Sequence, residues 1–451
     1  TLRQKLAAKA ATAGHLAMAD VDGDGDLDLF IGARSLPGNY PKSVDSWIYL
    51  NEEGAWKESP AWSAALQDIG LVTGAVFLNT DAHPLPDLLL ACDWGTPKIL
   101  VNTGTGFIDR TNQYGLAKFT GFWRGIDAGD FNGDGRMDFV AANRGLNAGY
   151  NASAEKPFIV YHGDLDGDGR REIIETERED GLIYPRRNLA TLNSAMPWLA
   201  EHLLNYDHYA QFTVEDFSEA ARLTKAVRSE ITTLQSMVFL RTDGGFEPTP
   251  LPVEAQLTAA FCPVVADFDN DGMEDIVLSQ NVFGVHREES RQDAGYGLLL
   301  LGQGSGTFKT TTIGESGLTV FGEGRGAATA DFNRDGRTDL VICQNGSKPK
   351  LFLNQAKRRG LRVQLQGGKG NREGVGAQIR LELKGKPGPS RTVRVGSGFL
   401  SQNSTTQILG ATENATALLV DWPSGEGERY KLAPNQSAIT AVSGQGEPLA
   451  N

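Results

Sequence analysis

A nine-residue pattern, D-x-[DN]-x-D-G-x-x-[DE], recurs along most of this 451-residue chain and constrains its fold more than any other feature. The five full copies span residues 20–28, 130–138, 164–172, 267–275 and 331–339. A sixth segment, 79–87, keeps the frame but lacks most of the carboxylates. The chain is longer than the roughly 250–300 residues that one hydrophobic core usually supports. The repeats therefore predict an architecture that grows by repetition.

The repeated residues have the chemistry of a calcium loop. Positions 1, 3, 5 and 9 carry the oxygen ligands that Ca²⁺ prefers, and position 6 is always glycine, where the turn needs a positive φ. Position 7 varies without shared chemistry, which suits ligation by its backbone carbonyl. A single copy could be an ordinary solvated turn, and an EF-hand would need a 12-residue loop between helices. Five copies in register favour about five Ca²⁺ sites.

The predicted ligands come from all five loops. They are Asp20, Asp22, Asp24, Asp26 and Asp28 in the first; Asp130, Asn132, Asp134, Arg136 and Asp138 in the second; Asp164, Asp166, Asp168, Arg170 and Glu172 in the third; Asp267, Asp269, Asp271, Met273 and Asp275 in the fourth; and Asp331, Asn333, Asp335, Arg337 and Asp339 in the fifth. The members at position 7 would contribute only their carbonyl oxygen.

Apolar runs on both sides of the loops indicate strands. LFIGA follows the first loop, GAATA precedes the last, and Gly-rich hairpins such as NTGTG come further on. Each unit is therefore predicted to be a four-stranded blade. The interval between the loops at 130 and 267 is long enough to contain a further blade with an insertion. Helical spacing predicts a two- or three-helix insertion over about residues 186–233.

The segment 79–87 is predicted to hold no ion although it keeps the blade frame. His83 replaces a carboxylate, and a nitrogen ligand suits Ca²⁺ poorly. Pro84 stands where the other loops have glycine, and its φ of about −65° prevents the same turn. Pro86 stiffens the return, so this loop should be organised without metal.

The units resemble the FG-GAP/VCBS repeats of calcium-loop β-propellers such as the integrin α head. The likeness extends over about residues 12–355 and rests on GFWRGIDAGDFNGDG and FGEGRGAATADFNRDG. Gly125 and Gly326 stand five residues before the first Asp, Gly74 keeps this offset in the sixth unit, and His15 and Cys262 occupy it elsewhere. Residues 371–442 resemble the ASPIC/UnbV domain, in the stretches GVGAQIRL, RTVRVGSGFLSQN and LLVDWPSG; the family's aromatic-plus-glycine element is reduced to QILGA.

This resemblance implies an all-β fold. It implies a six- or seven-bladed β-propeller with integrin α-like calcium loops over residues 1–358, carrying the helical insertion, and a small β-rich ASPIC/UnbV-like domain over 359–451. The group includes the cartilage acidic proteins, which are mostly described as matrix, adhesion or binding proteins. The resemblance thus implies a secreted protein of the extracellular space or periplasm, and extracellular Ca²⁺ would fill such loops without regulation.

Charge limits the partners. The formal net charge is −13, which argues against nucleic acid because its binders need a basic footprint. The sequence contains no run of 18 apolar residues, so it predicts no transmembrane segment. Residues 357–394 instead carry eleven basic and two acidic side chains. This basic segment could be solvated, could face an anionic partner, or could dock on the acidic propeller.

The sequence contains no recognisable catalytic set. Its six histidines form no HxH or HExxH motif, and the cysteines form no CxxC. We therefore expect a non-catalytic binding, adhesion or assembly-scaffold protein whose partner is another extracellular or periplasmic protein or a glycan. The alternative is a carbohydrate-active propeller enzyme of the polysaccharide lyase or dehydratase type. An acid/base set around the central channel would favour the enzyme, and a plugged channel would favour the binder.

Overall fold

The computed structural model describes residues 4–7, 9–81, 83–165, 167–203, 205–219 and 226–449, and these form an all-β chain, as predicted. The helices in this part are short and lie in the connections between strands. None of them is long and apolar enough to cross a membrane. Those outside the insertion are α1 (Pro60–Ser63), η1 (Ala64–Leu66), η4 (Val253–Gln256), α5 (Ile313–Ser316) and η5 (Thr412–Asn414).

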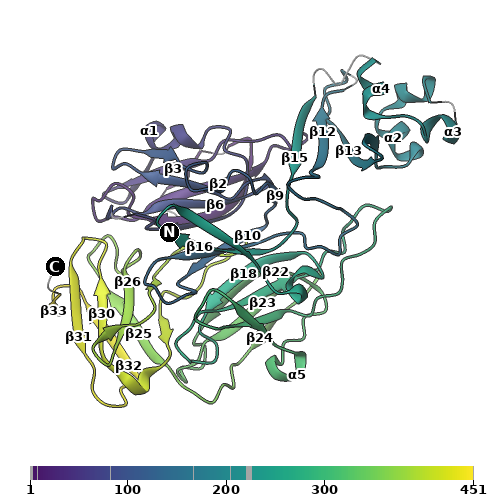
Figure 1. The fold of residues 1–451 in the computed structure, drawn as a ribbon. Coiled ribbons are helices and arrows are strands. Elements are labelled where there is room, and N and C mark those ends of the chain that lie inside the picture. Colours follow the sequence, from purple (N-terminus) through teal and green to yellow (C-terminus); the bar gives the residue numbers. More distant parts are fainter. Residues whose placement is uncertain are drawn as a thin grey trace.

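Five antiparallel sheets, which we call the fan, form the body of the molecule (Figure 1). In each sheet an acidic loop or the segment 79–87 joins the first strand to the second, as the flanking apolar runs predict. The strands are β1 (Thr12–Ala19), β2 (Asp28–Ser35), β3 (Trp47–Glu52) and β4 (Ala55–Glu58) in sheet 1; β5 (Leu71–Leu78), β6 (Asp87–Gly95), β7 (Lys98–Asn102) and β8 (Phe107–Asp109), with β9 (Gly121–Phe122) beside β6, in sheet 2; β10 (Gly125–Gly129), β11 (Asp138–Ala142), β16 (Met237–Thr242) and β17 (Gly245–Pro250) in sheet 3; β18 (Ala260–Ala266), β19 (Asp275–Gln280), β20 (Leu298–Gly302) and β21 (Phe308–Thr310) in sheet 4; and β22 (Glu323–Ala330), β23 (Asp339–Asn345) and β24 (Ser347–Phe352) in sheet 5.

The first strands of the five sheets pack side by side in chain order, β1 to β5, β10, β18 and β22. Apolar side chains fill the space between neighbouring sheets. Phe30 and Leu90 belong to one such cluster, and Val140 and Leu278 to another, all fully buried. Burial on both faces explains why these strands read as nearly continuous apolar runs. The sheets do not close into a ring, and the predicted count of six or seven blades is not confirmed.

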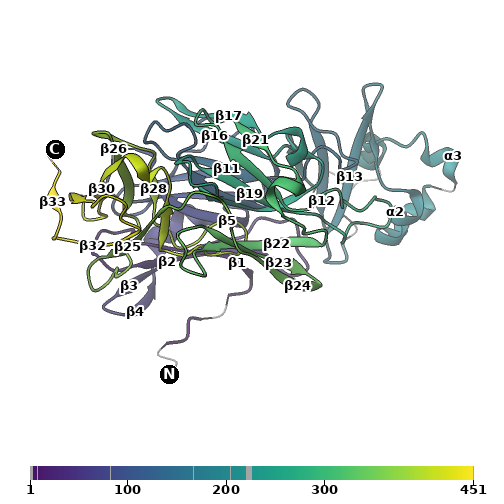
Figure 2. The same cartoon turned by 90° about the horizontal axis from the view of Figure 1, so that it is seen from below.

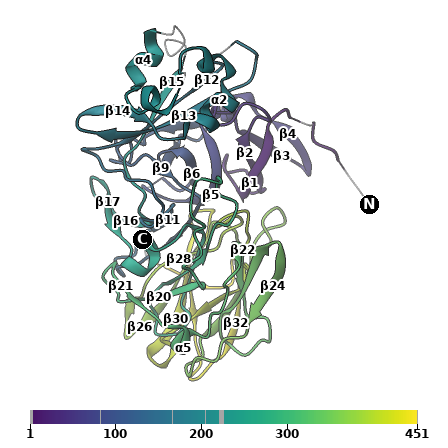
Figure 3. The same ribbon diagram turned by 90° about the vertical axis from the view of Figure 1, so that its right-hand side faces the viewer.

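The insertion lies within sheet 3, between β11 and β16. Because Phe139 of β11 pairs directly with Phe239 of β16, the chain leaves the sheet and returns to it. The inserted sheet has the order β14-β13-β12-β15 and lies at the opposite end of the molecule from the C-terminus (Figure 2). Figure 3 views the molecule from the side of this inserted sheet. Its elements are β12 (Phe158–Gly163), β13 (Glu172–Glu179), β14 (Leu182–Pro185), α2 (Leu189–Ala195), η2 (Pro197–Glu201), α3 (Tyr206–Tyr209), α4 (Val214–Glu219) and β15 (Val227–Ile231).

The interval between the loops at 130 and 267 contains a further four-stranded sheet, and α2, α3 and α4 lie within the expected 186–233, but two details differ from the predictions. The acidic loop 164–172 joins β12 to β13 in the inserted sheet, so it belongs to no blade of the fan. The strand β15 (Val227–Ile231) also lies within 186–233, where only helices were predicted. The repeat pattern identifies a strand–loop–strand unit, but it cannot show which sheet that unit joins. Helix α4 begins after Thr213, whose amide and hydroxyl donate to Asp216 Oδ2 at 2.6 and 2.8 Å.

Residues beyond β24 form two further sheets. One has the order β29-β25-β32, and the other has the order β27-β26-β30-β31-β33 with β28 beside β26. Their cores meet in one cluster that includes Val363, Ile379 and Trp422. The strands are β25 (Leu361–Gln366), β26 (Gln378–Leu383), β27 (Lys386–Pro387), β28 (Arg391–Thr392), β29 (Gln407–Leu409), β30 (Ala415–Asp421), β31 (Gly427–Lys431), β32 (Ala438–Val442) and β33 (Glu447–Pro448).

Between β28 and β29 the chain crosses the centre of the fan. We call residues 395–404 the central segment. Met18 of β1 donates to the Val395 carbonyl at 3.0 Å, and Gly398 exchanges two backbone hydrogen bonds with Ile126 of β10. At the far side, the Ser404 amide donates to the carbonyl of Thr329 in β22 at 2.8 Å. The central segment therefore connects the first sheet of the fan with the fifth.

Candidate metal centres

The five full loops share one hydrogen-bonded turn. The side chain of position 1 accepts from the amide of the glycine at position 6, and each of these glycines has the positive φ that the sequence predicts. The pairs are Gly25 with Asp20 (3.0 Å), Gly135 with Asp130 (2.9 Å), Gly169 with Asp164 (3.2 Å), Gly272 with Asp267 (2.9 Å) and Gly336 with Asp331 (3.2 Å). The side chain of position 5 likewise accepts from the amide of position 7, at Asp26, Arg136, Arg170, Met273 and Arg337. The turn brings positions 1 and 5 toward the same interior.

Position 9 is held by backbone donors. In sheet 1, Asp28 accepts from the Val21 amide with one oxygen and from the Asn51 amide of β3 with the other, both at 2.9 Å. The corresponding residues Asp138, Asp275 and Asp339 make the same pair of contacts. Asp87 does so too, in the segment without the metal chemistry. Position 9 therefore fastens the loop to the third strand whether or not a metal is bound, a role that the sequence pattern did not reveal.

Two loops bring three carboxylates together. Among the described residues, oxygens of Asp20, Asp22 and Asp24 lie within 4.8 Å of one another. Oxygens of Asp267, Asp269 and Asp275 lie equally close together. These oxygen clusters have the donor chemistry that a Ca²⁺ ion requires. In this respect the residues fit the ion that the sequence predicts.

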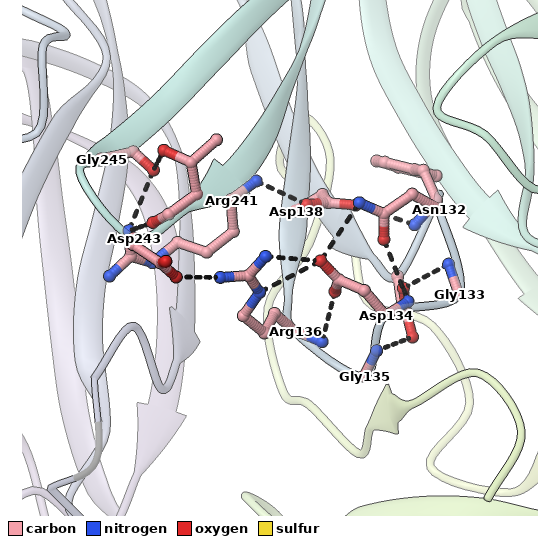
Figure 4. Close-up of polar contacts among 12 residues, drawn as sticks. Asn132, Gly133, Asp134, Gly135, Arg136, Asp138, Arg241, Asp243 and Gly245 are labelled. Carbon is pink, nitrogen blue, oxygen red and sulfur yellow. Dashed lines mark hydrogen bonds and ion pairs between the residues drawn. The ribbon is translucent and has the colours of Figure 1, made fainter.

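The loops with Asn at position 3 differ because an arginine occupies part of the site. Arg136 donates to Asp134 Oδ2 at 2.8 Å and also reaches Asp243 (Figure 4). Arg337 makes the matching pair with Asp335 at 2.7 Å. Asn132 and Asn333 donate to the same two carboxylates, at 3.2 and 3.1 Å. A guanidinium thus supplies part of the positive charge that a cation would supply in these loops.

Burial of the carboxylates disfavours their charged forms. It raises the pKa values of Asp28, Asp138 and Asp267 to about 7, and like charges nearby add to the effect. Burial also raises the pKa of Asp20 and Asp130. A bound divalent cation would reverse this cost, since an opposite charge favours the ionised form.

The loop of the inserted sheet is described only in part, because Asp166 lies outside the described residues. Gly167 donates to Asp164 at 2.7 Å, and Leu165 donates to Glu172 at 2.7 Å. The Arg170 amide donates to Asp168 at 2.7 Å. These contacts repeat the turn of the other loops.

The segment 79–87 closes on itself. The side-chain amide of Asn79 donates to the carbonyls of His83 and Pro84 at 3.2 and 3.0 Å. The Thr80 amide donates to Asp87 at 3.0 Å. A donor therefore points into the space where the other loops have a carboxylate.

The C-terminal sheets lie against the four acidic loops of the fan. The Ser390 amide donates to Asp130 Oδ2 at 3.0 Å, and the Ala411 amide donates to the Asn270 carbonyl at 3.2 Å. The Gly360 amide donates to the Gly336 carbonyl at 2.8 Å. At the first loop Gly370 approaches so closely that a side chain there would overlap Asp26.

Two arginines of the basic segment end on buried acids of the fan, so the docking interpretation is confirmed for them. Arg391 makes two hydrogen bonds with Glu274, at 2.7 and 2.8 Å. Arg394 donates to Asp127 Oδ1 at 2.7 Å, and Asp127 is fully buried. Docking was one of three interpretations that the local charge left open, and only the fold identifies the acids.

Most of the central segment lies in the stretch RTVRVGSGFLSQN, which resembles the ASPIC/UnbV domain. The sequence did not indicate that this segment lies at the centre of the fan. Gly74 and Gly125 approach the Gly398 carbonyl so closely that a Cβ atom on either would lie 2.9 Å from it. The Phe399 amide donates to Cys262 Sγ at 3.2 Å, and the Ala327 amide donates to Ser401 Oγ at 3.1 Å. The glycines five residues before the acidic loops were the available signal, because glycine there permits close backbone approach.

Comparison with known proteins agrees with two of these regions. The FG-GAP-like repeat family matches residues 79–141, and the ASPIC and UnbV family matches residues 367–448. The chain therefore contains an FG-GAP-like repeat and an ASPIC/UnbV domain. No curated protein matches the chain.

Solved structures give weaker likenesses. A rhamnogalacturonan lyase PL11 from Bacillus licheniformis has 11% identity and a TM-score of 0.30, over 95% of this chain and 72% of that one. The exotype rhamnogalacturonan lyase YesX has 11% identity and a TM-score of 0.33, over 96% and 73%. The rhamnogalacturonan lyase YesW has 11% identity and a TM-score of 0.31, over 95% and 72%. These scores are too low to support an argument about fold or function.

Proposed function

We propose that this chain is a secreted, calcium-stabilised binding or assembly-scaffold protein without catalytic activity, built on a β-propeller over residues 1–358. The observation that carries the proposal is the contact between the C-terminal sheets and four acidic loops. Ser390, Ala411 and Gly360 hydrogen-bond to three of these loops. Ca²⁺ in the loops would neutralise their carboxylates and hold them in the shape that the C-terminal sheets contact.

The loops fall into two classes in this proposal. Asp20, Asp22 and Asp24 of the first loop, and Asp267, Asp269 and Asp275 of the fourth, would hold the tighter ions because three carboxylates converge in each. The loops at 130–138 and 331–339 would bind more weakly, since an arginine already pairs with position 5. The segment 79–87 would bind none. The ions would serve the fold and would carry out no chemistry.

The filled centre supports a binder over the alternative carbohydrate-active enzyme. A propeller enzyme would need its acid/base set at the central channel, and here the central segment occupies that position with backbone hydrogen bonds to Met18, Ile126 and Thr329. The partner would be another extracellular or periplasmic protein or a glycan. The acidic charge of the chain argues against nucleic acid.

Calcium removal tests the proposal. The purified chain should unfold at a clearly lower temperature in excess chelator than in millimolar Ca²⁺, because each site stabilises by about 2.7 kcal/mol at a hundredfold excess over Kd. Mg²⁺ should restore little, since it demands octahedral geometry and dehydrates reluctantly. An unchanged melting curve in chelator would contradict the calcium role. Cleavage of acidic polysaccharides by the calcium-loaded chain would contradict the non-catalytic role.

A further inference from the structure

A cavity of about 490 Å³ opens at the end of the fan away from the acidic loops. Its position follows from the strands. Arg34 lies near the end of β2 and Arg325 near the start of β22, whereas the acidic loops join the other ends of these strands. Phe399 of the central segment and Glu175 of the inserted sheet also line it. The cavity is therefore built by the fan, the insertion and the central segment together.

Five arginines line this cavity in a protein whose net charge is −13. Four of them are paired. Arg124 contacts Asp93 at 3.0 Å, and Arg325 contacts Glu323 at 2.9 Å. Arg144 and Arg187 contact Glu289 at 3.1 and 2.8 Å, and Arg187 also pairs with Glu175. Four carboxylates thus balance four arginines.

Arg34 is the fifth, and among the described residues it has no hydrogen-bond or ion-pair partner. Its Nη1 atom is buried without an acceptor. The guanidinium lies over the Phe399 ring, 5.6 Å from its centroid. Burial and then the neighbouring Arg124 lower the pKa of Arg34, while Asp93 nearby acts in the opposite direction. A partly buried charge without a hydrogen-bonded or ion-paired partner is costly, which points to a partner that binds from outside.

Aromatic rings form another part of the wall. Phe122 packs edge-on against Trp94 at 4.7 Å, and Phe261 packs against Phe399 at 5.4 Å. Arg325 lies 3.9 Å from the centroid of Phe261, which holds its guanidinium against the ring. The cavity thus combines apolar faces with one arginine that has no hydrogen-bonded or ion-paired partner among the described residues. That combination suits a ligand with a carbon skeleton and a single negative charge.

We propose that this cavity binds a small organic monocarboxylate, with the Arg34 guanidinium pairing to the carboxylate and the aromatic rings contacting the carbon skeleton. The guanidinium fork matches a carboxylate with two parallel hydrogen bonds. One excess positive charge matches a monoanion, whereas phosphate carries more charge than Arg34 can balance. The inference rests on the proposed binding function, but it uses none of the calcium loops.

The test is calorimetric titration of the full, calcium-loaded chain with three probes: glucuronate, lactate and benzoate. Glucose and benzamide are matched neutral controls for two of them, and inorganic phosphate tests a simple anion site. At least one carboxylate should bind, and its neutral counterpart should not. Binding should fall at least tenfold in Arg34→Met, because a hydrogen bond to a charged group is lost. Arg110→Met, at an exposed arginine outside the cavity, should bind as the unchanged chain does.

Three results would overturn the proposal: no response to any of the three carboxylates, phosphate binding as tightly as the best of them, or unchanged binding in Arg34→Met. A second measurement separates binding from structure. In carboxylate-free buffer Arg34→Met should melt at the same temperature or higher, since it removes an unpaired, partly buried charge and keeps an apolar contact with Phe399. A clear drop would show that Arg34 is a structural residue. Because calcium stays bound throughout, failure here would leave the calcium role untouched.

Discussion

Replacing Arg391 by methionine should separate the C-terminal sheets from the fan more effectively than any surface substitution. The side chains of Arg391 and Glu274 are 11% and 4% exposed, and two hydrogen bonds join them. Arg391 also donates to the Ile408 carbonyl at 2.7 Å. Removing one partner of a buried pair leaves the other charge without compensation, which costs about 3–5 kcal/mol. We expect a loss of that size in the free energy of unfolding measured in urea.

The matched control is Arg380→Met, which breaks a pair with Asp421 inside the C-terminal sheets. That pair is more exposed, at 24% and 39%, so the loss should be about 0–1 kcal/mol. The double substitution Arg391→Met with Glu274→Leu should recover much of the stability, because no buried charge remains. The effect should change little with salt, since buried pairs are weakly screened. Equal losses for Arg391→Met and Arg380→Met would refute the reasoning.

Three further predictions concern the loops and the central segment. In chelator the chain should melt at a lower temperature at pH 8 than at pH 5.5: the folded pKa values of Asp28, Asp138 and Asp267, raised to about 7, favour the metal-free fold at low pH, and that stability is lost as pH rises through about 7. With saturating Ca²⁺ the fall should be smaller, and equal falls in melting curves would contradict it. Asp20→Asn should reduce the calcium-dependent rise in melting temperature, whereas Asn79→Asp should add nothing, because Pro84 still blocks the turn; a gain in Asn79→Asp would show that one carboxylate suffices. Gly398→Ala should destabilise the chain more than Gly385→Ala, because both have positive φ but only a Cβ at 398 would overlap Cys262 Sγ; comparable losses in thermal unfolding would mean that the central segment tolerates side chains.

Local chemistry was predictable from the sequence. The glycine at position 6 requires positive φ, and Gly25 and Gly272 have it. The apolar runs beside the loops form strands, because the sheets bury apolar side chains that would otherwise be exposed to water. The turn of the 79–87 segment differs, as Pro84 and His83 indicate. Each of these inferences depends on residues within about ten positions of one another.

Relations between distant residues were not predictable. The inserted sheet has the same strand–loop–strand signature as the fan, but β11 pairs with β16 across it. The pattern also did not show that position 9 ties the loop to the third strand, as Asp28 does by accepting from the amides of Val21 in its own loop and of Asn51 in β3. Arg34 gave no signal, because its neighbours Arg124, Arg325 and Phe399 come from other sheets and from the central segment. Sequence patterns show the chemistry of the residues, whereas the contacts around Arg34 and Asp28 depend on which strands and sheets lie side by side.

The predicted boundary at residues 358 and 359 lies between the two family matches, but contacts between the described residues cross it. The central segment belongs to the C-terminal sheets by chain order, yet it contacts β1, β10, β18 and β22. Two of those strands have glycine at the contact. A Cβ atom at Gly125 or Gly326 would fill the space that the central segment occupies. The fan does not close on itself, so the segment supplies the link between Met18 and Thr329 that sheet pairing does not. The same C-terminal sheets also touch the acidic loops. Binding of Ca²⁺ to the loops and docking of the central segment in the fan should therefore increase and decrease together.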